Sequence, residues 1–403
     1  MTRGTFDVIV VGGGPAGATA AHELARRGHS VLLLDRAGRI KPCGGAVPPR
    51  LMRDFEIPES LLVARATAAR MVAPSDRQVD IPIENGYVGM VDREFFDEWL
   101  RARAATHGAH RQSGQFERLE RDDDGCAVVQ FRVRDPAQPG GLAGTPHRVR
   151  AKAVIGADGA RSEVARQALP DAAERGAFVF AYHEIVRTPA AQPAGFEGSR
   201  CEVHYRGSLS PDFYGWMFPH GNTISIGSGS ADRGFSLRGA VADLRRRLAL
   251  SGAETLRREG APIPMKPLPR WDNGRDVLLA GDAAGVVAPA SGEGIYYAMA
   301  CGRMAGEAVA AFLKSGDARV LRQARRRFMR EHGRVFWVLG MMQRFWYRSD
   351  GRRERFVGIC RDRDVQQLTF EAYMHKRLVR ARPLAHVRIF FKDLAHLLGL
   401  VRA

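Results

Sequence analysis

The sequence predicts an α/β protein with a Rossmann-like nucleotide-binding domain, an antiparallel-sheet domain and a helical C-terminal region. Three observations predict this arrangement. A glycine-rich turn separates an apolar strand from a helix near the N-terminus, apolar and polar residues alternate in the middle of the chain, and the last part is helical and basic in pattern. We expect the nucleotide-binding domain to occupy 1–166 and 270–325, the sheet domain 167–269, and the C-terminal region 326–403.

The composition indicates a globular intracellular protein. The 403 residues suffice for two or three packed subdomains, and 45% of them are hydrophobic. The five cysteines are odd in number and scattered, which favours a reducing compartment without disulfides. The N-terminus runs directly into "FDVIVVGGGPAG", which leaves no room for a signal peptide, and no apolar stretch approaches the ~18 residues of a membrane span. We therefore expect a cytoplasmic location.

The positive charge is concentrated at the C-terminal end. Of the net charge of +17, residues 320–403 contribute +13, from 20 Lys and Arg against 7 Asp and Glu. This region also holds the apolar run "VFWVLGMM", which is too short to span a bilayer. We expect peripheral binding to an anionic membrane surface and no nucleic acid partner. A last helix would place these apolar residues on one face, although it could equally pack on the body of the protein: Phe390, Leu394, Leu397, Leu398 and Val401.

The N-terminal segment has the pattern of a dinucleotide-binding turn. The apolar run 6–11 reads as a buried strand, "ATAAHELARRG" as a helix, and "SVLLLD" as a second strand. Glycines in this turn allow a tight bend, close approach of the backbone to a pyrophosphate, and close packing of helix and strand. The acidic residue that ends the second strand is placed to accept hydrogen bonds from an adenosine ribose. The expected binding residues are Gly12, Gly14, Ala16, Gly17, Asp35 and Arg36.

Two later segments indicate that the dinucleotide is FAD. "AVIGADGARSEVAR" resembles the Asp-Gly motif of the p-hydroxybenzoate hydroxylase group, which implies that Asp158 lies beside FAD. "DVLLAGDAAGVVAPASGEGIYYAMACGRMAGE" resembles the later flavin segment of the same superfamily. That resemblance implies an aspartate bound to the ribityl chain and a helix whose N-terminus points at the flavin. It adds to the expected FAD site these residues: Gly281, Asp282, Gly292, Gly294 and Ile295.

The loop "KPCGGAVPPR" and the strand "PDFYGWMFPHG" carry a narrower resemblance. Together with the flavin segment, they are similar to the geranylgeranyl reductase family, and most to its bacteriochlorophyll and chlorophyll-synthesis branch. The resemblance implies a reductase that saturates all but one double bond of a geranylgeranyl tail to give phytyl. The tail would be carried by bacteriochlorophyll or by a diphosphate. NADPH is the implied reductant, although no second G-x-G-x-x-G follows a strand.

The chemistry of an isolated alkene suggests which residues act. Hydride transfer to an isolated alkene leaves charge that nothing can delocalise, so a proton must reach the neighbouring carbon in the same step or earlier. An acid must therefore lie within reach of the alkene, and aromatic faces must stabilise a transient cation. Cys43 is the candidate acid, and Gly44 and Gly45 would let its loop pass close to the flavin; a pocket-shaping role for Cys43 stays open. Strand spacing places Tyr214, Trp216 and Phe218 on one face of a tail channel, with His220 nearby. No metal site is expected.

Other functions share parts of this pattern. An FAD-dependent aromatic monooxygenase of the same superfamily would consume oxygen and need a small polar pocket. A non-enzymatic, membrane-associated flavoprotein would show no turnover with NADPH. An archaeal type of lipid reduction would keep the chemistry and change only the substrate.

Overall fold

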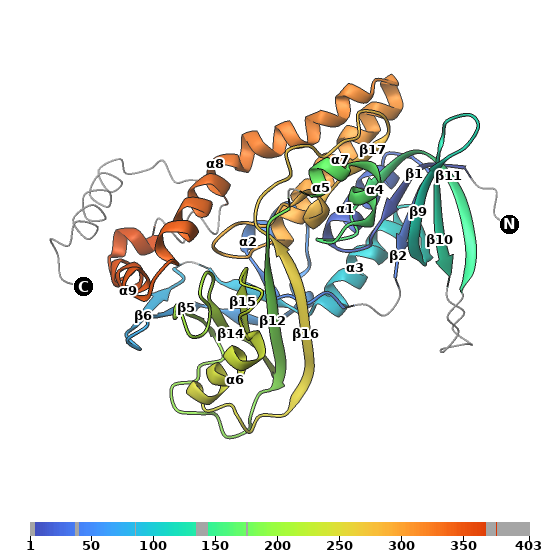
Figure 1. Cartoon of the computed structure of the whole chain (residues 1–403). Coiled ribbons are helices and arrows are strands. Elements are labelled where there is room, and N and C mark those ends of the chain that lie inside the picture. The colour runs from blue at the N-terminus through green and yellow to red at the C-terminus, as the bar shows by residue number, and fades with distance from the viewer. Residues whose placement is uncertain are drawn as a thin grey trace. The chain divides into compact units, whose positions relative to one another are not determined.

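A computed structural model describes residues 5–36, 40–84, 86–133, 144–174, 176–367 and Lys376. The described residues form two compact units, each assembled from three stretches of chain (Figure 1). The first unit falls within Met1–Lys41, Arg93–Phe178 and Ile263–Gly333, and the second within Pro42–Asp92, Val179–Pro262 and Arg334–Ala403.

The first unit is built on a mixed sheet that begins with the N-terminal strand. The strands run in the order β8-β2-β1-β11-β10-β9, and β17 pairs with β11. Its strands are β1 (Thr5–Val11), β2 (Val31–Asp35), β8 (His110–Ser113), β9 (Gln115–Arg121), β10 (Ala127–Val133), β11 (Thr145–Gly156) and β17 (Val277–Leu279). Its helices include α1 (Pro15–Ala25), α3 (Arg93–Thr106), α4 (Glu163–Ala168), α5 (Pro170–Ala173) and α7 (Ile295–Ser315), with short 3₁₀ turns η2 (Gly281–Ala284) and η3 (Ala318–Leu321).

The centre of this sheet is parallel and fully buried. β1 pairs in parallel with both β2 and β11, and β11 pairs in parallel with β17. Val8, Ile9 and Val10 have no exposed surface. This is the environment that a continuous run of β-branched residues requires, because a parallel sheet covered on both faces offers no solvated side. α1 begins four residues after β1 and ends before Gly28, whose φ of +82° suits a glycine at a helix end.

The second unit is built on a seven-stranded sheet of order β16-β12-β15-β14-β13-β5-β6. These strands are β5 (Ala68–Val72), β6 (Gln78–Pro82), β12 (Phe178–Arg187), β13 (Arg200–His204), β14 (Gly215–His220), β15 (Thr223–Ser230) and β16 (Thr255–Pro264). A small sheet contains β3 (Ala46–Val47), β4 (Leu62–Ala66) and β7 (Val88–Val91). The remaining elements are α2 (Pro49–Asp54), η1 (Glu59–Leu61), α6 (Leu237–Arg247) and α9 (Asp350–Ile359).

One face of the large sheet packs against α6. Met217 of β14 lies in this core, together with apolar residues of β12, β15, α6 and the segments before β14 and after α6: Val186, Leu209, Ile224, Ile226, Val241, Leu244 and Leu250. Because side chains alternate along a strand, Trp216 and Phe218 on either side of Met217 point to the opposite face. The alternation of residues along β14 therefore places its aromatic rings on the face opposite to the one that packs on α6.

The compact units differ from the expected division of the chain in two respects. The region expected over 326–403 is not a unit of its own, because its residues up to Gly333 fall in the first unit and its later described residues in the second. Residues 42–92 belong to the second unit, whereas the sequence places them in the nucleotide-binding domain over 1–166. The physical reason is that β5 pairs in parallel with β13, which joins this stretch to the large sheet. The sheet is consequently antiparallel except at that one pair.

The basic C-terminal region is helical where it is described. α8 (Arg322–Trp346) ends in the second unit and is followed by α9. The buried guanidinium of Arg353 in α9 donates to the backbone carbonyls of Ser210 and Tyr347 and ties this helix to the loop before β14. No helix in the described part of the chain is long and apolar enough to cross a membrane. The expected last helix with Phe390 lies outside the described residues.

Candidate active site

Three glycine-containing segments meet in the first unit. Gly12 has a φ of +106°, and a Cβ there would lie 2.3 Å from the carbonyl oxygen of Ala157. A Cβ on Gly17 would lie 1.8 Å from the carbonyl oxygen of Gly12. Gly281, with a φ of +65°, would place a Cβ 2.6 Å from that of Ala16. The structure thus brings the N-terminal turn together with the segments of Asp158 and Asp282.

The N-terminus of α1 meets the requirements of a phosphate site. Gly14 precedes this helix in an extended conformation, and no side chain caps the free N–H groups of the first turn. A Cβ on Gly14 would meet no atom within 4 Å. Open space beside uncapped amides at a helix N-terminus fits a pyrophosphate, because the backbone can approach it and the helix dipole favours its charge.

Asp35 lies at the end of β2 and over the same turn. A Cβ on Gly13 would be 2.7 Å from its carboxylate. Arg101 of α3 donates to Asp35 across 3.2 Å and to the carbonyl of Gly13, a contact that sequence reasoning missed because α3 is about 60 residues away in the chain. Arg36 follows Asp35 and is exposed. The carboxylate remains part-exposed and able to accept hydrogen bonds from a ribose.

Asp158 lies beside the turn, but its side chain is turned to α4. Its carboxylate accepts hydrogen bonds from the hydroxyl of Ser162 and from the backbone N–H groups of Glu163 (2.7 Å) and Val164 (3.2 Å). Burial raises the pKa of the Asp158 carboxyl, while these hydrogen bonds favour its charged form. The carboxylate therefore organises the first turn of α4, and its backbone is the part that lies against Gly12.

Asp282 marks the start of the last flavin segment. Its carboxylate is largely buried and forms an ion pair with the ammonium of Lys41. A Cβ on Gly294, the residue that precedes α7, would lie 3.9 Å from Asp282 Oδ1. Gly294 supplies no capping side chain, and Ile295 is the buried first residue of α7. Gly292, with a φ of +65°, closes the preceding turn by donating to the carbonyl of Ala288.

These residues fit FAD as an extended dinucleotide. The uncapped N-terminus of α1 suits a pyrophosphate, Asp35 suits a ribose, and Asp282 with the uncapped N-terminus of α7 suits a polar, electron-accepting ring system. In the described residues no group of three or more His, Cys, Asp or Glu side chains is arranged to hold a metal ion.

The second unit brings the Cys43 loop onto β14. A Cβ on Gly44 would lie 3.0 Å from the ring of Phe218, and one on Gly45 would lie 2.7 Å from Nε2 of His220. Gly45 also has a φ of +70°, so no other residue would fit without strain. Cys43 Sγ accepts a hydrogen bond from the N–H of Gly45 at 3.4 Å. The glycines therefore let the loop lie flat on the residues that were expected to line a channel.

The rings of Tyr214, which directly precedes β14, and of Trp216 and Phe218 in β14 form a row on the face away from α6. The centroids of Tyr214 and Trp216 are 6.1 Å apart, and those of Trp216 and Phe218 are 6.3 Å apart. Tyr214 and Trp216 are buried, and Phe218 is half-buried. Burial lowers the pKa of His220, although the carbonyls of Phe218 and Gly44 and the nearby Asp92 favour its charged form. His220 is therefore neutral near pH 7.

The four other cysteines differ from Cys43 in their surroundings. Burial raises the pKa of the Cys201 thiol to about 12, and also that of the Cys301 thiol, whose sulfur accepts from the N–H of Gly281. Cys360 is buried, and Cys126 lies half-exposed in a turn beside Asp122. Cys43 alone among them lies in the glycine loop on β14.

Two features of the site besides Arg101 were missed in the sequence. Lys41 lies two residues before Cys43, and its pairing with Asp282 joins residues 241 positions apart. Gly227 of β15 faces Trp216, and a Cβ there would lie 2.1 Å from the indole. The signal for Gly227 was the run "SIGSGS", in which small residues alternate opposite the large rings of "YGWMF".

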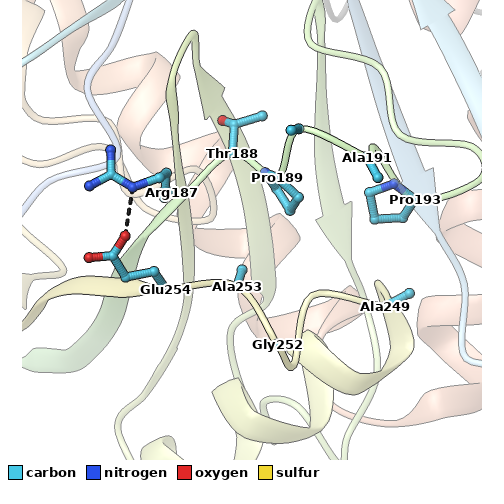
Figure 2. A pocket seen from close by; sticks show the side chains of 10 residues that line it. Arg187, Thr188, Pro189, Ala191, Pro193, Ala249, Gly252, Ala253 and Glu254 are labelled. Carbon is cyan, nitrogen blue, oxygen red and sulfur yellow. Dashed lines mark hydrogen bonds and ion pairs between the residues drawn. The ribbon is translucent and has the colours of Figure 1, made fainter.

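A separate, shallow pocket of about 360 Å³ lies where β12 ends and β16 begins (Figure 2). It is lined by alanine, proline and glycine, and its two charged groups, Arg187 and Glu254, pair with each other at 2.6 Å. It contains none of the expected site residues.

Comparison with known proteins agrees with this geometry. The FAD binding domain model matches residues 5–188, and the lycopene cyclase protein model matches residues 235–384. The chain is 57% identical to the geranylgeranyl diphosphate reductase of Rhodobacter capsulatus, with 98% of each chain covered. It is 37% identical to the chloroplastic geranylgeranyl diphosphate reductase of Oryza sativa, with 98% of this chain and 86% of that protein covered.

A solved structure shows the same fold. A geranylgeranyl bacteriochlorophyll reductase-like protein from Thermoplasma acidophilum aligns with a TM-score of 0.80 at 22% identity, covering 94% of this chain and 98% of that one. Fold and site define an FAD-dependent oxidoreductase with the p-hydroxybenzoate hydroxylase type of FAD-binding domain. The near full-length identity is more specific. The chain belongs to the geranylgeranyl diphosphate reductase family, and the resemblance seen in its motifs is confirmed.

Proposed function

We propose that this protein saturates isolated double bonds of a geranylgeranyl chain to give phytyl, with FAD as cofactor and NADPH as reductant. The observation that carries the proposal is the 57% identity to a geranylgeranyl diphosphate reductase along 98% of both chains. The substrate is the chain attached to bacteriochlorophyll or carried as a diphosphate, which places the enzyme in pigment synthesis for photosynthesis.

Each reduced double bond gains one hydride and one proton, and one NADPH becomes NADP⁺. The N-terminus of α1, Asp35 and Asp282 would hold FAD, which would supply the hydride-transfer chemistry between NADPH and the alkene. The protein must then place a proton donor at one alkene carbon and tolerate positive charge at the other. A carboxylic acid would be costly to keep beside an apolar tail, whereas a thiol is not.

Cys43 is the residue that we propose as proton donor. Its sulfur accepts from the Gly45 N–H, so its own S–H is the group that remains to donate. The loop lies on Phe218 and His220 through Gly44 and Gly45, which supports a position of the neighbouring thiol at the ring-bearing face of β14.

The aromatic row would stabilise the cationic transition state. Tyr214, Trp216 and Phe218 follow one another at about 6 Å and would meet successive positions of a bound tail, where each cation–π contact contributes about 0.5–2 kcal/mol. Rings stabilise the charge without forming a bond to carbon, so the intermediate is not trapped.

Anaerobic turnover tests this function. The purified protein, loaded with FAD, is mixed with NADPH and either geranylgeranyl diphosphate or geranylgeranylated bacteriochlorophyll, and the product mass is followed. We expect a gain of two hydrogens per step, up to six. NADPH oxidation that requires oxygen, without any gain of mass by the tail, would instead indicate a monooxygenase.

We also propose that the protein binds an anionic membrane surface from its cytoplasmic side. Trp337 and Met341 of α8 are 64% and 50% exposed. They lie one helical turn apart, and the exposed Arg334 and Arg344 lie one turn before and one turn after them. An apolar centre between two cationic ends suits a helix at the headgroup level of a bilayer. Such a location would also give access to a lipid-soluble tail.

Co-sedimentation with liposomes measures this binding. We expect retention on vesicles with anionic lipid, a loss of retention on neutral vesicles, and a decrease with added salt, because each arginine contributes about 1 kcal/mol of screened attraction. Trp337→Glu should weaken retention strongly. Phe95→Glu is the matched control, since Phe95 is 65% exposed on α3. Retention that ignores both lipid charge and salt would contradict the proposal.

A further inference from the structure

A chain of hydrogen bonds runs behind the indole of Trp216 and across four strands. Trp216 Nε1–H donates to Ser225 Oγ at 3.2 Å. Ser225 Oγ lies 2.9 Å from His183 Nδ1, and His183 Nε2 lies 3.0 Å from a carboxylate oxygen of Glu259. These residues come from β14, β15, β12 and β16, which are neighbours in the sheet. Trp216, Ser225 and His183 are buried.

With a neutral His183 imidazole, the donors in this chain all point in one direction. The indole N–H has no acceptor capacity, so Ser225 Oγ must accept from it. The carboxylate of Glu259 has no proton to give, so His183 Nε2 carries the hydrogen. In the neutral imidazole Nδ1 is then an acceptor, and the Ser225 hydroxyl donates a hydrogen bond to it. The result is a polarised series from the indole to a carboxylate, which Arg257 also contacts at 3.1 Å.

The backbone makes room for this arrangement. Gly227 pairs with Trp216 on one side and with His183 on the other. A Cβ on Gly227 would lie 2.1 Å from the indole and 2.6 Å from His183 Cβ. The indole therefore lies across β15 over a residue without a side chain, and its ring plane is fixed by the strand beneath and the hydrogen bond at its nitrogen.

We infer that Ser225, His183 and Glu259 are positioning residues that orient the Trp216 indole and increase the electron density of its ring. A donor N–H polarised toward a half-buried carboxylate leaves more negative charge on the indole, and hydrogen bonds in series reinforce one another. A more electron-rich ring attracts a cation more strongly. The inference rests on the proposed function, in which Trp216 faces the cationic carbon.

Two variants interrupt the chain at different points. Ser225→Ala removes the acceptor of the indole N–H, and Glu259→Gln keeps the shape but removes the charge at the far end. Glu254→Gln is the control, because Glu254 is an exposed carboxylate next to the same strand. The probe is geranylgeranyl diphosphate in single turnovers of the full-length FAD-loaded protein.

We expect each variant to lower the rate of alkene reduction about tenfold at an unchanged KM, with FAD content and flavin reduction by NADPH as in the wild type. In a Trp216→Phe background the same substitutions should have no further effect. An equal loss in both backgrounds would overturn the inference, because Ser225 and Glu259 would then act independently of the indole.

A spectroscopic measurement tests this inference independently of the proposed function. The ultraviolet resonance Raman signal of the Trp216 N–H, obtained as the difference between wild type and Trp216→Phe, reports its hydrogen bond without any substrate. We expect a shift to a weaker hydrogen bond in Ser225→Ala and a smaller shift in Glu259→Gln. If the wild type fails to reduce the tail, the proposed function is wrong. The Raman shift still tests the hydrogen bonds from Trp216 to Glu259, because it needs no substrate. An unshifted signal in both variants overturns the inference.

Discussion

Cys43→Ala should abolish most tail reduction while FAD binding and flavin reduction by NADPH stay normal. General acid catalysis contributes about 10²–10⁴-fold, so the single-turnover rate of alkene reduction should fall by that factor. The loop itself should survive, because its contacts with Phe218 and His220 are made by Gly44 and Gly45 and not by the sulfur. Stopped-flow flavin reduction and alkene reduction, measured on the same preparation, separate the two steps.

Two further variants, Cys43→Ser and Cys126→Ala, distinguish proton donation from a pocket-shaping role. Cys43→Ser should recover little activity, since a hydroxyl is a much weaker acid than a thiol, whereas a pocket-shaping role would tolerate serine. Cys126→Ala is the control, because Cys126 has similar half-exposure in a turn. Cys201 and Cys301 should not substitute, since burial raises the pKa of both thiols to about 12 and makes them weaker acids than an ordinary thiol. A wild-type rate in Cys43→Ala would mean that the proton comes from elsewhere.

The parts of the fold that the sequence predicted are those in which neighbours in the chain are neighbours in space. Only 31 residues contain β1, the turn at Gly12, α1 and β2. The motif alone explains why the turn requires glycines, because a side chain there would clash with neighbouring backbone. The alternation in "YGWMFPHG" likewise specified the ring-bearing face of β14, because the period of a strand is local information.

The missed features depend on contacts between distant segments. β5 joins the large sheet by pairing with β13, about 130 residues further on, and nothing in residues 68–72 encodes that partner. The ion pair of Lys41 with Asp282 and the hydrogen-bond chain from Trp216 to Glu259 also arise only when strands are placed side by side. Asp158 shows a different limit of prediction from a motif. The motif correctly predicted where the Asp158 backbone lies, but it did not predict that the carboxylate would bind the first turn of α4.

Asp282→Ala should sharply reduce the amount of FAD that purifies with the protein. A carboxylate that accepts hydrogen bonds from a bound ligand contributes about 1.5–3 kcal/mol, which corresponds to roughly 10–150-fold weaker binding. The protein should be yellow with one non-covalent FAD per chain, and the variant pale. Occupancy is read from the ratio of flavin to protein absorbance, and the dissociation constant from the quenching of flavin fluorescence on titration into the deflavinated protein.

A loss of FAD in Asp282→Ala would also follow if Asp282 acted only through its ion pair with Lys41. The same measurement of FAD occupancy distinguishes these two causes. If Asp282 acts on FAD itself, Lys41→Gln should retain nearly wild-type occupancy, because the carboxylate remains in place beside α7. If Asp282 acts only by anchoring Lys41, the two variants should lose FAD equally. Asp123→Ala serves as the control for removing an exposed carboxylate. Equal occupancy in Asp282→Ala and Asp123→Ala would show that Asp282 does not bind the cofactor, and the assignment of this flavin segment would have to be abandoned.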